Sequence, residues 1–479
     1  MPRRASSPAA KRTPIATPPT RITATARQRA RSPAAAAQGS SALPPAKILE
    51  FSGSQLRFLI GIITFLDTFA VGLVNPIYPL LVKSDLLGAT LFALIMSASN
   101  AAALMGSTIY GRIADVHGRR LAVIASACTT CLGFILYVVG FACEGVFPKP
   151  RMLLPAAGRI ISGMGRAALA GPLLAMLADH ADNKNTVAQD TTRVVATFGF
   201  GYAAGSGVGG YILSVGGTWL NLAFISLCIC AQVLCAWQLP PDNGSSDDES
   251  RPSRGSRSSQ SSRKAPPTRG ASASMAAVLR AALAIPTTRA LLLVQALTAA
   301  SFHVYDSTGA IYMQDHLGFT PPQRGYILSY AGWMFALQTF FAVPWLVSSG
   351  FQQGALLCYA LLCTGIGRVG LACATFGYPT LAIVSSYPIL NLGQGMSHTL
   401  LKALMSKAAA AEDRGLLLGV LESVSKSFGV LGPMLGGPIY DALGPPAPAM
   451  ASCILAFMGA LAAAALAVEP DPTQKAKQL

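Results

Sequence analysis

The ionisable side chains inside long apolar runs are the residues of this sequence best placed to do chemistry. Asp67 lies in the middle of one run, Arg159 and Arg166 lie seven residues apart in a second, and His303 and Asp306 lie three residues apart in a third. Charged groups in apolar surroundings are unfavourable unless they pair, face water or carry out a function. Asp67 could therefore bind a cation, carry a proton or form a buried ion pair, with Arg159 as one partner.

Helical spacing places several of these polar side chains on common faces. His303 and Asp306 at i and i+3 could relay protons, because histidine titrates near physiological pH, or could form a plain polar face at the outer end of a helix. Asn391, Gln394 and His398 follow at i, i+3 and i+7, which favours one face directed toward a cavity.

Three further charged side chains lie within predicted spans. Arg368 lies alone in an apolar run, whereas Glu422 and Lys426 are spaced i,i+4, which predicts a salt bridge within one helix. Arg159 and Arg166 can share one face, since seven residues make two helical turns, although Arg159 could also lie at the membrane interface and extend its side chain to water.

Membrane-spanning helices are the elements that must position these residues. The 479 residues are 52% hydrophobic and 12% charged, about half the charged fraction of soluble domains. Apolar runs of ~20 residues cross a bilayer, and their backbone groups must be satisfied within a helix. We predict an all-α integral membrane protein with twelve transmembrane helices at residues 56–81, 88–111, 120–142, 152–178, 194–216, 219–239, 289–313, 325–349, 354–375, 378–403, 415–440 and 446–468.

An internal repeat divides these helices into two halves of six. Residues 205–210 read Gly-Ser-Gly-Val-Gly-Gly, and residues 432–437, located 227 positions later, read Gly-Pro-Met-Leu-Gly-Gly. Residues 163–165 (Gly-Met-Gly) match residues 393–395 (Gly-Gln-Gly) at an offset of 230. Glycines four residues apart form a groove for a neighbouring helix. The expected helix-packing residues are Gly205, Gly209, Gly210, Gly432, Pro433, Gly436 and Gly437.

Charge and composition predict five parts in the chain. These are a disordered basic tail (1–50), a first six-helix bundle (51–239), a flexible basic linker (240–285), a second bundle (286–468) and a short tail (469–479). The net charge of +16 gathers in the tail, the linker and alternate loops, so the positive-inside rule places both termini and the linker in the cytosol. This distribution indicates a bilayer rather than nucleic acid as the partner.

The N-terminal segment 1–46 has two interpretations. It is rich in Arg, Ser, Pro and Ala, and no acidic residue precedes Glu50. It could be a cytosolic tail attracted to anionic lipid, or a transit peptide, which has a similar composition. The prolines disfavour an amphipathic helix and therefore favour the tail.

The loop after the second predicted helix carries a spaced motif, Gly111-x-x-x-Asp115-x-x-Gly118-Arg119-Arg120. Gly111 suits close helix packing, Gly118 permits a sharp turn, and Asp115 can accept hydrogen bonds from a helix N-terminus or an arginine. Arg119 and Arg120 would hold the loop on the cytosolic side. This motif resembles the loop between helices 2 and 3 of the major facilitator superfamily.

The resemblance implies a conformational latch. In that family the loop locks the two halves in the outward-open state, which implies that Asp115 and Arg119 are latch residues; the alternative is a basic turn needed only for insertion. The corresponding loop of the second half, residues 348–353, has no charged residue, so any latch is one-sided. The family architecture places the substrate site near mid-membrane between the halves.

Three more motifs are similar to patterns of proton-coupled members. Residues 159–168 resemble Arg-x-x-x-Gly-x-Gly-x-Ala-Ala, which implies a proton-coupling role for Arg159. The glycine run at 205–210 resembles the antiporter motif Gly-Pro-x-x-Gly-Gly, but Ser206 stands in place of the proline. The run at 432–437 matches the whole motif, with Pro433 at the proline position. Asp67 followed by a later proline in the same helix resembles the drug:proton antiporter branch, which includes tetracycline-efflux-like carriers.

We therefore expect a monomeric secondary transporter that moves a small organic solute by alternating access. Coupling to protons, with antiport favoured, is the first expectation, and the solute could be a cation, an anion or a zwitterion. The alternatives are an uncoupled facilitator and a non-transporting receptor or scaffold on the same fold. The sequence shows no cofactor motif, no metal-binding cluster and no hydrolase motif, so we expect no enzyme. Both a plasma membrane and a vacuolar or other organellar membrane remain open.

Overall fold

The computed structural model describes residues 53–77, 88–142, 153–179, 184–240, 280, 283–408 and 414–468. The chain divides into two units, Met1–Leu49 and Glu50–Leu479, and every helix reported below belongs to the second. The two predicted tails and nearly all of the predicted linker lie outside the described residues.

The first half supplies six spans in five helical elements. The element α5 contains two spans, because Gly217 interrupts it with a φ of 67°, a left-handed conformation that glycine adopts without strain. This break falls between the spans predicted at 194–216 and 219–239. The elements are α1 (Gly53–Val74), α2 (Ala89–His117), α3 (Arg119–Ala142), α4 (Leu153–Asp179) and α5 (Lys184–Trp237).

The second half supplies the remaining six spans. One of them is composite, since α8 (Pro321–Leu337), the π-helix η4 (Gln338–Ala342) and α9 (Val343–Ser348) follow one another without a break. A capping box between Thr320 and Gln323 starts α8. The other elements are α7 (Pro286–Ile311), the π-helix η3 (Tyr312–His316), α10 (Gln353–Ala372), the 3₁₀-helix η5 (Cys373–Phe376), α11 (Pro379–Ala408), α12 (Arg414–Leu443) and α13 (Ala447–Val468). The described helices thus account for all twelve predicted spans.

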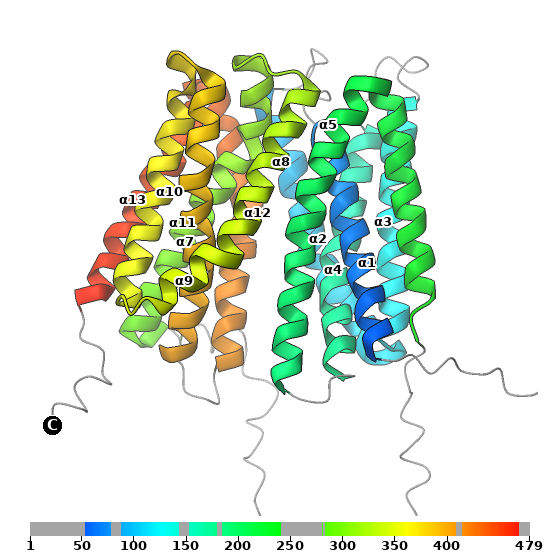
Figure 1. Ribbon diagram of the computed structural model, residues 1–479, viewed down its shortest axis with the longest axis horizontal. Coiled ribbons are helices and arrows are strands. Elements are labelled where there is room, and N and C mark those ends of the chain that lie inside the picture. Colours follow the sequence, from blue (N-terminus) through cyan, green and yellow to red (C-terminus); the bar gives the residue numbers. More distant parts are fainter. Residues whose placement is uncertain are drawn as a thin grey trace, which may run out of the picture. The chain divides into compact units, whose positions relative to one another are not determined.

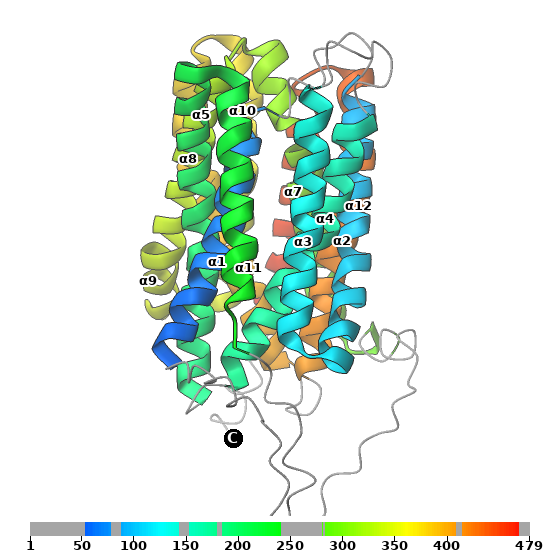
Figure 2. The same ribbon diagram turned by 90° about the vertical axis from the view of Figure 1, so that its right-hand side faces the viewer.

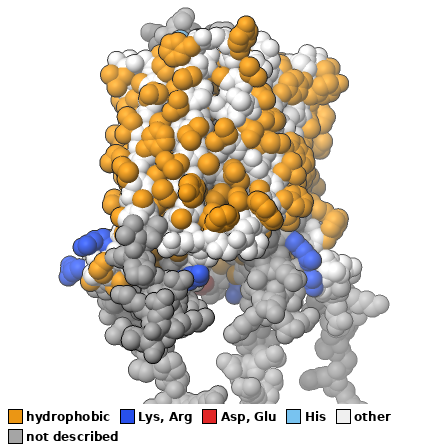
Figure 3. Space-filling view, turned by 60° about the vertical axis from the view of Figure 1, so that its left-hand side comes forward, with side chains coloured by type: hydrophobic (Ala, Val, Ile, Leu, Met, Phe, Trp, Pro, Cys, Tyr) orange, Lys and Arg blue, Asp and Glu red, His pale blue; other side chains and the backbone are white. Residues whose placement is uncertain are grey.

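The outer surface of these helices is apolar. By length and composition, eight helical stretches in the described part of the chain could cross a membrane, one of which is the double span in α5. The long helices α7, α11 and α12 are not among the eight. Figure 3 shows hydrophobic side chains spread over the face seen there, with Lys and Arg gathered below them.

Figures 1 and 2 show the helices side by side along a common direction, and Figure 1 shows α1–α5 in one group and α7–α13 in the other. The two glycine runs make equivalent contacts within these halves. On α5, a methyl group at Gly209 would lie 2.9 Å from Cα of Leu73 on α1, and on α12 a methyl group at Gly436 would meet the backbone of Val304 on α7. Each run therefore packs its helix against the first helix of its own half, as expected of helix-packing glycines.

The helix contacts also show the shorter repeat, residues 163–165 and 393–395, but they match different glycines of the two segments. A methyl group at Gly165 on α4 would meet Ser126 and Thr130 on α3, and one at Gly393 on α11 would meet Ala360 and Thr364 on α10. In both cases the threonine hydroxyl donates to the carbonyl oxygen of the residue four positions earlier. Gly165 therefore corresponds to Gly393, at an offset of 228, and the pairing of Gly163 with Gly393 made from the sequence is corrected.

Among the described residues, the two halves contact each other mainly along α5 and α8 and along α2 and α12. We call the end of this contact that lies opposite the 111–120 loop the distal seam. It joins α5 to α8, where a methyl group at Gly210 would lie 3.1 Å from Cα of Gly325, and α2 to α12, where a methyl group at Gly437 would lie 2.6 Å from Cα of Thr90. In Figure 1, α5 and α8 lie close together at the top and diverge toward the bottom.

Two charged residues reinforce the distal seam. The carboxylate of Asp441 on α12 accepts hydrogen bonds at the N-terminus of α2, from the amides of Ala89 (3.1 Å) and Thr90 (2.9 Å) and from the hydroxyl of Thr90 (2.5 Å). Arg324 on α8 is buried and donates to the carbonyl oxygen of Pro76, just beyond α1, at 2.9 Å. A carboxylate at a helix N-terminus is favourable, so these contacts hold the distal end closed.

Candidate functional site

A cavity of about 990 Å³ lies between the two halves and is lined by helices from both. Its walls combine aromatic rings with a smaller set of polar groups, which is typical of sites for small organic molecules. The two π-helical segments also border it, at Met313 of η3 and at Thr339 and Phe340 of η4. The polar and charged residues of the lining are Thr68, Asn75, Asn100, Arg159, Tyr202, His303, Tyr305, Asp306, Ser307, Thr339, Arg368, Tyr387, Asn391 and Gln394.

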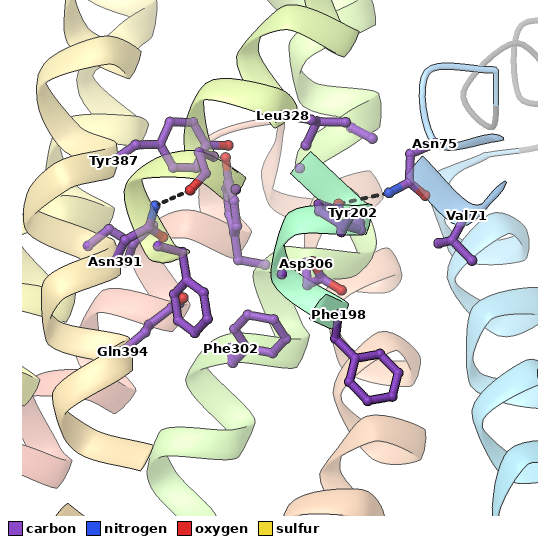
Figure 4. A pocket seen from close by; sticks show the side chains of 18 of the residues that line it. Val71, Asn75, Phe198, Tyr202, Phe302, Asp306, Leu328, Tyr387, Asn391 and Gln394 are labelled. Carbon is purple, nitrogen blue, oxygen red and sulfur yellow. Dashed lines mark hydrogen bonds between the residues drawn. The ribbon is translucent and has the colours of Figure 1, made fainter. Parts of the chain in front are cut away.

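Five of the candidate residues chosen from the sequence line this cavity. Arg159 comes from α4, His303 and Asp306 come from α7, and Asn391 and Gln394 come from α11. The carboxylate of Asp306 is exposed to the space between the halves, and Figure 4 shows it between Tyr202 and Phe302. The helix faces predicted from residue spacing on α7 and α11 therefore line the same cavity.

The α11 face is anchored to α8. The side-chain amide of Asn391 donates to the carbonyl oxygen of Ala331 at 2.8 Å (Figure 4), while Gln394 lies one turn further along the cavity wall. His398, which the spacing placed on the same face, is not part of the cavity lining.

Asp67 and Arg166 lie together outside the cavity lining. Nε of Arg166 is 3.2 Å from a carboxylate oxygen of Asp67, and the amide nitrogen of Gln232 on α5 is 3.4 Å from the other oxygen. Asp67 is only 3% exposed. The described partner of Asp67 is thus Arg166 rather than Arg159, whose guanidinium donates to the sulfur of Met96 at 3.7 Å.

The sequence reasoning missed several groups of the cavity wall. Asn75 donates to the hydroxyl of Tyr202 at 2.7 Å, which joins the end of α1 to α5 (Figure 4). Tyr305 and Tyr387 also line the cavity, and their residue type gave no signal. Arg368 lines it as well, and the sequence had marked it as a lone charge in an apolar run without assigning it a role.

Two arginines of the 111–120 loop donate to backbone oxygens of the first half. Gly118 has a φ of 96°, in agreement with a sharp turn between α2 and α3. Arg119 donates to the carbonyl oxygen of Ala175 on α4 at 2.6 Å, and Asp115 is exposed. A methyl group at Gly111 would have no neighbour within 4 Å, so the close packing expected there is absent from the described residues in this conformation.

A second ion-pair expectation is wrong. Glu422 on α12 pairs with Lys402 on α11 at 3.5 Å, and not with Lys426 one turn along its own helix. Both side chains are more than half exposed, so this pair contributes little to stability.

Comparison with known proteins agrees with this geometry. The family model of the Major Facilitator Superfamily matches residues 60–291 and 291–479. Mouse solute carrier family 22 member 18 is 24% identical over 376 residues, covering 77% of this chain and 86% of that protein. The class C tetracycline resistance protein of Escherichia coli is 24% identical over 406 residues, covering 82% and 91%, which agrees with the tetracycline-efflux likeness of the motifs.

Solved structures show the same fold. The nucleoside transporter NupG superposes with a TM-score of 0.63 at 12% identity, covering 86% of this chain and 98% of NupG. A D-xylose–proton symporter superposes with a TM-score of 0.62 at 14% identity, covering 85% and 95%. The two six-helix halves, the cavity between them and the match along both halves lead to one conclusion: this chain is a multi-pass membrane transporter that belongs to the Major Facilitator Superfamily.

Proposed function

We propose that this transporter is a proton-coupled antiporter of a small organic solute and works as a monomer by alternating access. The observation that supports it most is the cavity between the halves, in which the titratable His303 and Asp306 lie on the same face of α7. Its volume of about 990 Å³ suits a drug-sized solute.

The proposed change between two conformations depends on opening and closing the distal seam. In the proposed cycle, the state with the distal seam closed is open toward the 111–120 loop. The opposite state requires α5 to separate from α8 and α2 to separate from α12. In the proposed cycle Asp115 and Arg119 then contact the other half and hold the loop side closed.

The cavity residues divide into proposed roles. Asp306 and His303 exchange protons with water in the open cavity, and Arg159 tunes that exchange by its positive charge. Asn391 and Gln394 hydrogen-bond the solute. The Asp67–Arg166 pair holds α1 to α4 and carries no proton.

Transport in proteoliposomes tests the proposal, with tetracycline as the first probe because a tetracycline resistance protein is among the relatives. We expect uptake driven by a pH gradient, and we expect Asp306→Asn to lower gradient-driven accumulation at least tenfold while exchange of labelled for unlabelled solute persists. Glu422→Gln, which alters an exposed carboxylate outside the cavity lining, is the matched control.

Three results would contradict this proposal. Equal accumulation with and without a gradient would indicate a facilitator. Binding without any flux across a panel of organic cations, anions and zwitterions would indicate a receptor. Unchanged coupling in Asp306→Asn would remove the carboxylate from the mechanism.

A further inference from the structure

Arg368 is a buried cation in the cavity wall without an ionic partner. It lies on α10, is 2% exposed and lines the cavity. Its guanidinium carbon lies 4.1 Å from the centre of the Tyr305 ring, a cation–π contact. Its Nε has no hydrogen-bond partner, and no carboxylate among the described residues forms an ion pair with it.

Arg324, which is also buried in the second half, makes hydrogen bonds through its two terminal guanidinium nitrogens, although its Nε also lacks a partner. Arg324 donates to the side-chain oxygen of Gln314 at 2.7 Å and to the carbonyl oxygens of Phe319 and Pro76. A stacked ring offsets only about 2 kcal/mol of the unfavourable burial of a guanidinium, which has five donors. The described residues offer Arg368 neither an acceptor for its Nε nor an ionic partner, which favours an anion that arrives from the cavity.

The surroundings of Arg368 indicate the rest of such a ligand. The hydroxyl-bearing rings of Tyr305 and Tyr387 and the carboxylate of Asp306 line the same cavity, and the ring of Tyr305 stacks on the guanidinium. Asp306 remains exposed to the cavity and does not pair with Arg368 in the described residues. Aromatic side chains from both halves supply flat apolar walls: Phe92, Phe198, Phe200, Phe302, Phe335 and Phe340.

We propose that Arg368 binds the anionic group of the transported solute, and that the substrates are small organic anions with a flat apolar body. A carboxylate fits the planar fork of a guanidinium with two parallel hydrogen bonds, and the apolar body contacts the phenylalanine rings. This assignment rests on the proposed function of the cavity as the transport site, and it narrows the solute class to anions.

Binding of a matched series of probes to the purified full chain tests the assignment. The probes are 1-naphthoate, the neutral 1-naphthamide and the cationic 1-naphthylmethylammonium, which share one ring system. We expect naphthoate to bind at least tenfold more tightly than the other two and to raise the unfolding temperature. Arg368→Met should lose this preference, and Arg368→Lys should keep part of it, since lysine offers one point charge without the fork.

Arg289→Met is the matched control, because Arg289 is exposed and lies outside this cavity's lining. Arg368→Met should be as stable as the wild type without ligand, because it removes a buried charge that has no ionic partner. Equal naphthoate affinity in Arg368→Met and wild type, or no binding of naphthoate by the wild type, would overturn the assignment. Since binding is measured without a gradient, loss of proton coupling would refute the proposed function and leave this result intact.

Discussion

At the scale of single residues, the same side-chain type has different roles according to its partners. Asp67 is enclosed by Arg166 and Gln232 within the first half, whereas Asp306 is exposed to the cavity. A buried ion pair is sensitive to removal of one partner, because the remaining charge is then left without compensation. An exposed carboxylate in a watery cavity can exchange its proton without that penalty.

Substitution at the buried pair should therefore reveal a structural role. We expect Arg166→Met to lower the free energy of unfolding by about 3–5 kcal/mol, the usual effect of leaving one buried charge unpaired. The double variant Asp67→Leu with Arg166→Met should recover most of the loss. Thermal unfolding of purified protein measures both. A double variant as unstable as the single one, or one that folds fully but loses proton coupling alone, would assign Asp67 a functional role.

At the scale of elements, neighbouring glycines of α12 face different helices. A methyl group at Gly436 would lie 2.6 Å from the hydroxyl of Ser307 on α7 of the same half, while one at Gly437 would approach Thr90 on α2 of the other half. A methyl group at Gly419 would have no neighbour within 4 Å. One helix therefore carries a site for bundle packing, a site for the distal seam and a neutral site.

These three positions should respond differently to alanine. We expect Gly436→Ala to lower the unfolding temperature, because α12 and α7 must move apart. Gly437→Ala should leave each half folded and shift the population toward separation of α2 from α12, measured by spin-label distances across the distal seam. Gly419→Ala should be neutral or stabilising by up to about 1 kcal/mol, since alanine favours helix. The same seam distances in all three variants would contradict this division.

At the scale of the whole molecule, the charge distribution predicts which side of the membrane each end occupies. The 111–120 loop and the basic linker should lie in the cytosol, and the distal seam should face the other compartment. Membrane-impermeant maleimide checks this in a background without reactive cysteines. Arg120→Cys and Arg257→Cys should label from one side and Tyr378→Cys, in the turn before α11, from the other. Labelling of the first two from opposite sides would refute the topology.

The sequence was sufficient for the spans and for much of the cavity wall, because both follow from local patterns. Apolar length located all twelve spans, and spacing of three or four residues placed His303 with Asp306 and Asn391 with Gln394 on cavity-facing surfaces. The partner of Asp67 and the closed distal seam did not follow, because they depend on which helices meet in space. The sequence marked Arg368 as a lone charge in an apolar run, but its contact with Tyr305 did not follow, because that contact depends on how α10 and α7 meet.

The cross-half cap at Asp441 also bears on how each transport cycle ends. Three hydrogen bonds to one carboxylate must break, and their groups must bind water instead, whenever α2 separates from α12. The same three bonds must re-form when the two helices come together again. Because the two amides belong to successive residues at the first turn of α2, only one alignment of the helices satisfies them all. If the proposed cycle holds, this carboxylate would return α2 and α12 to the same relative position at the end of every turnover.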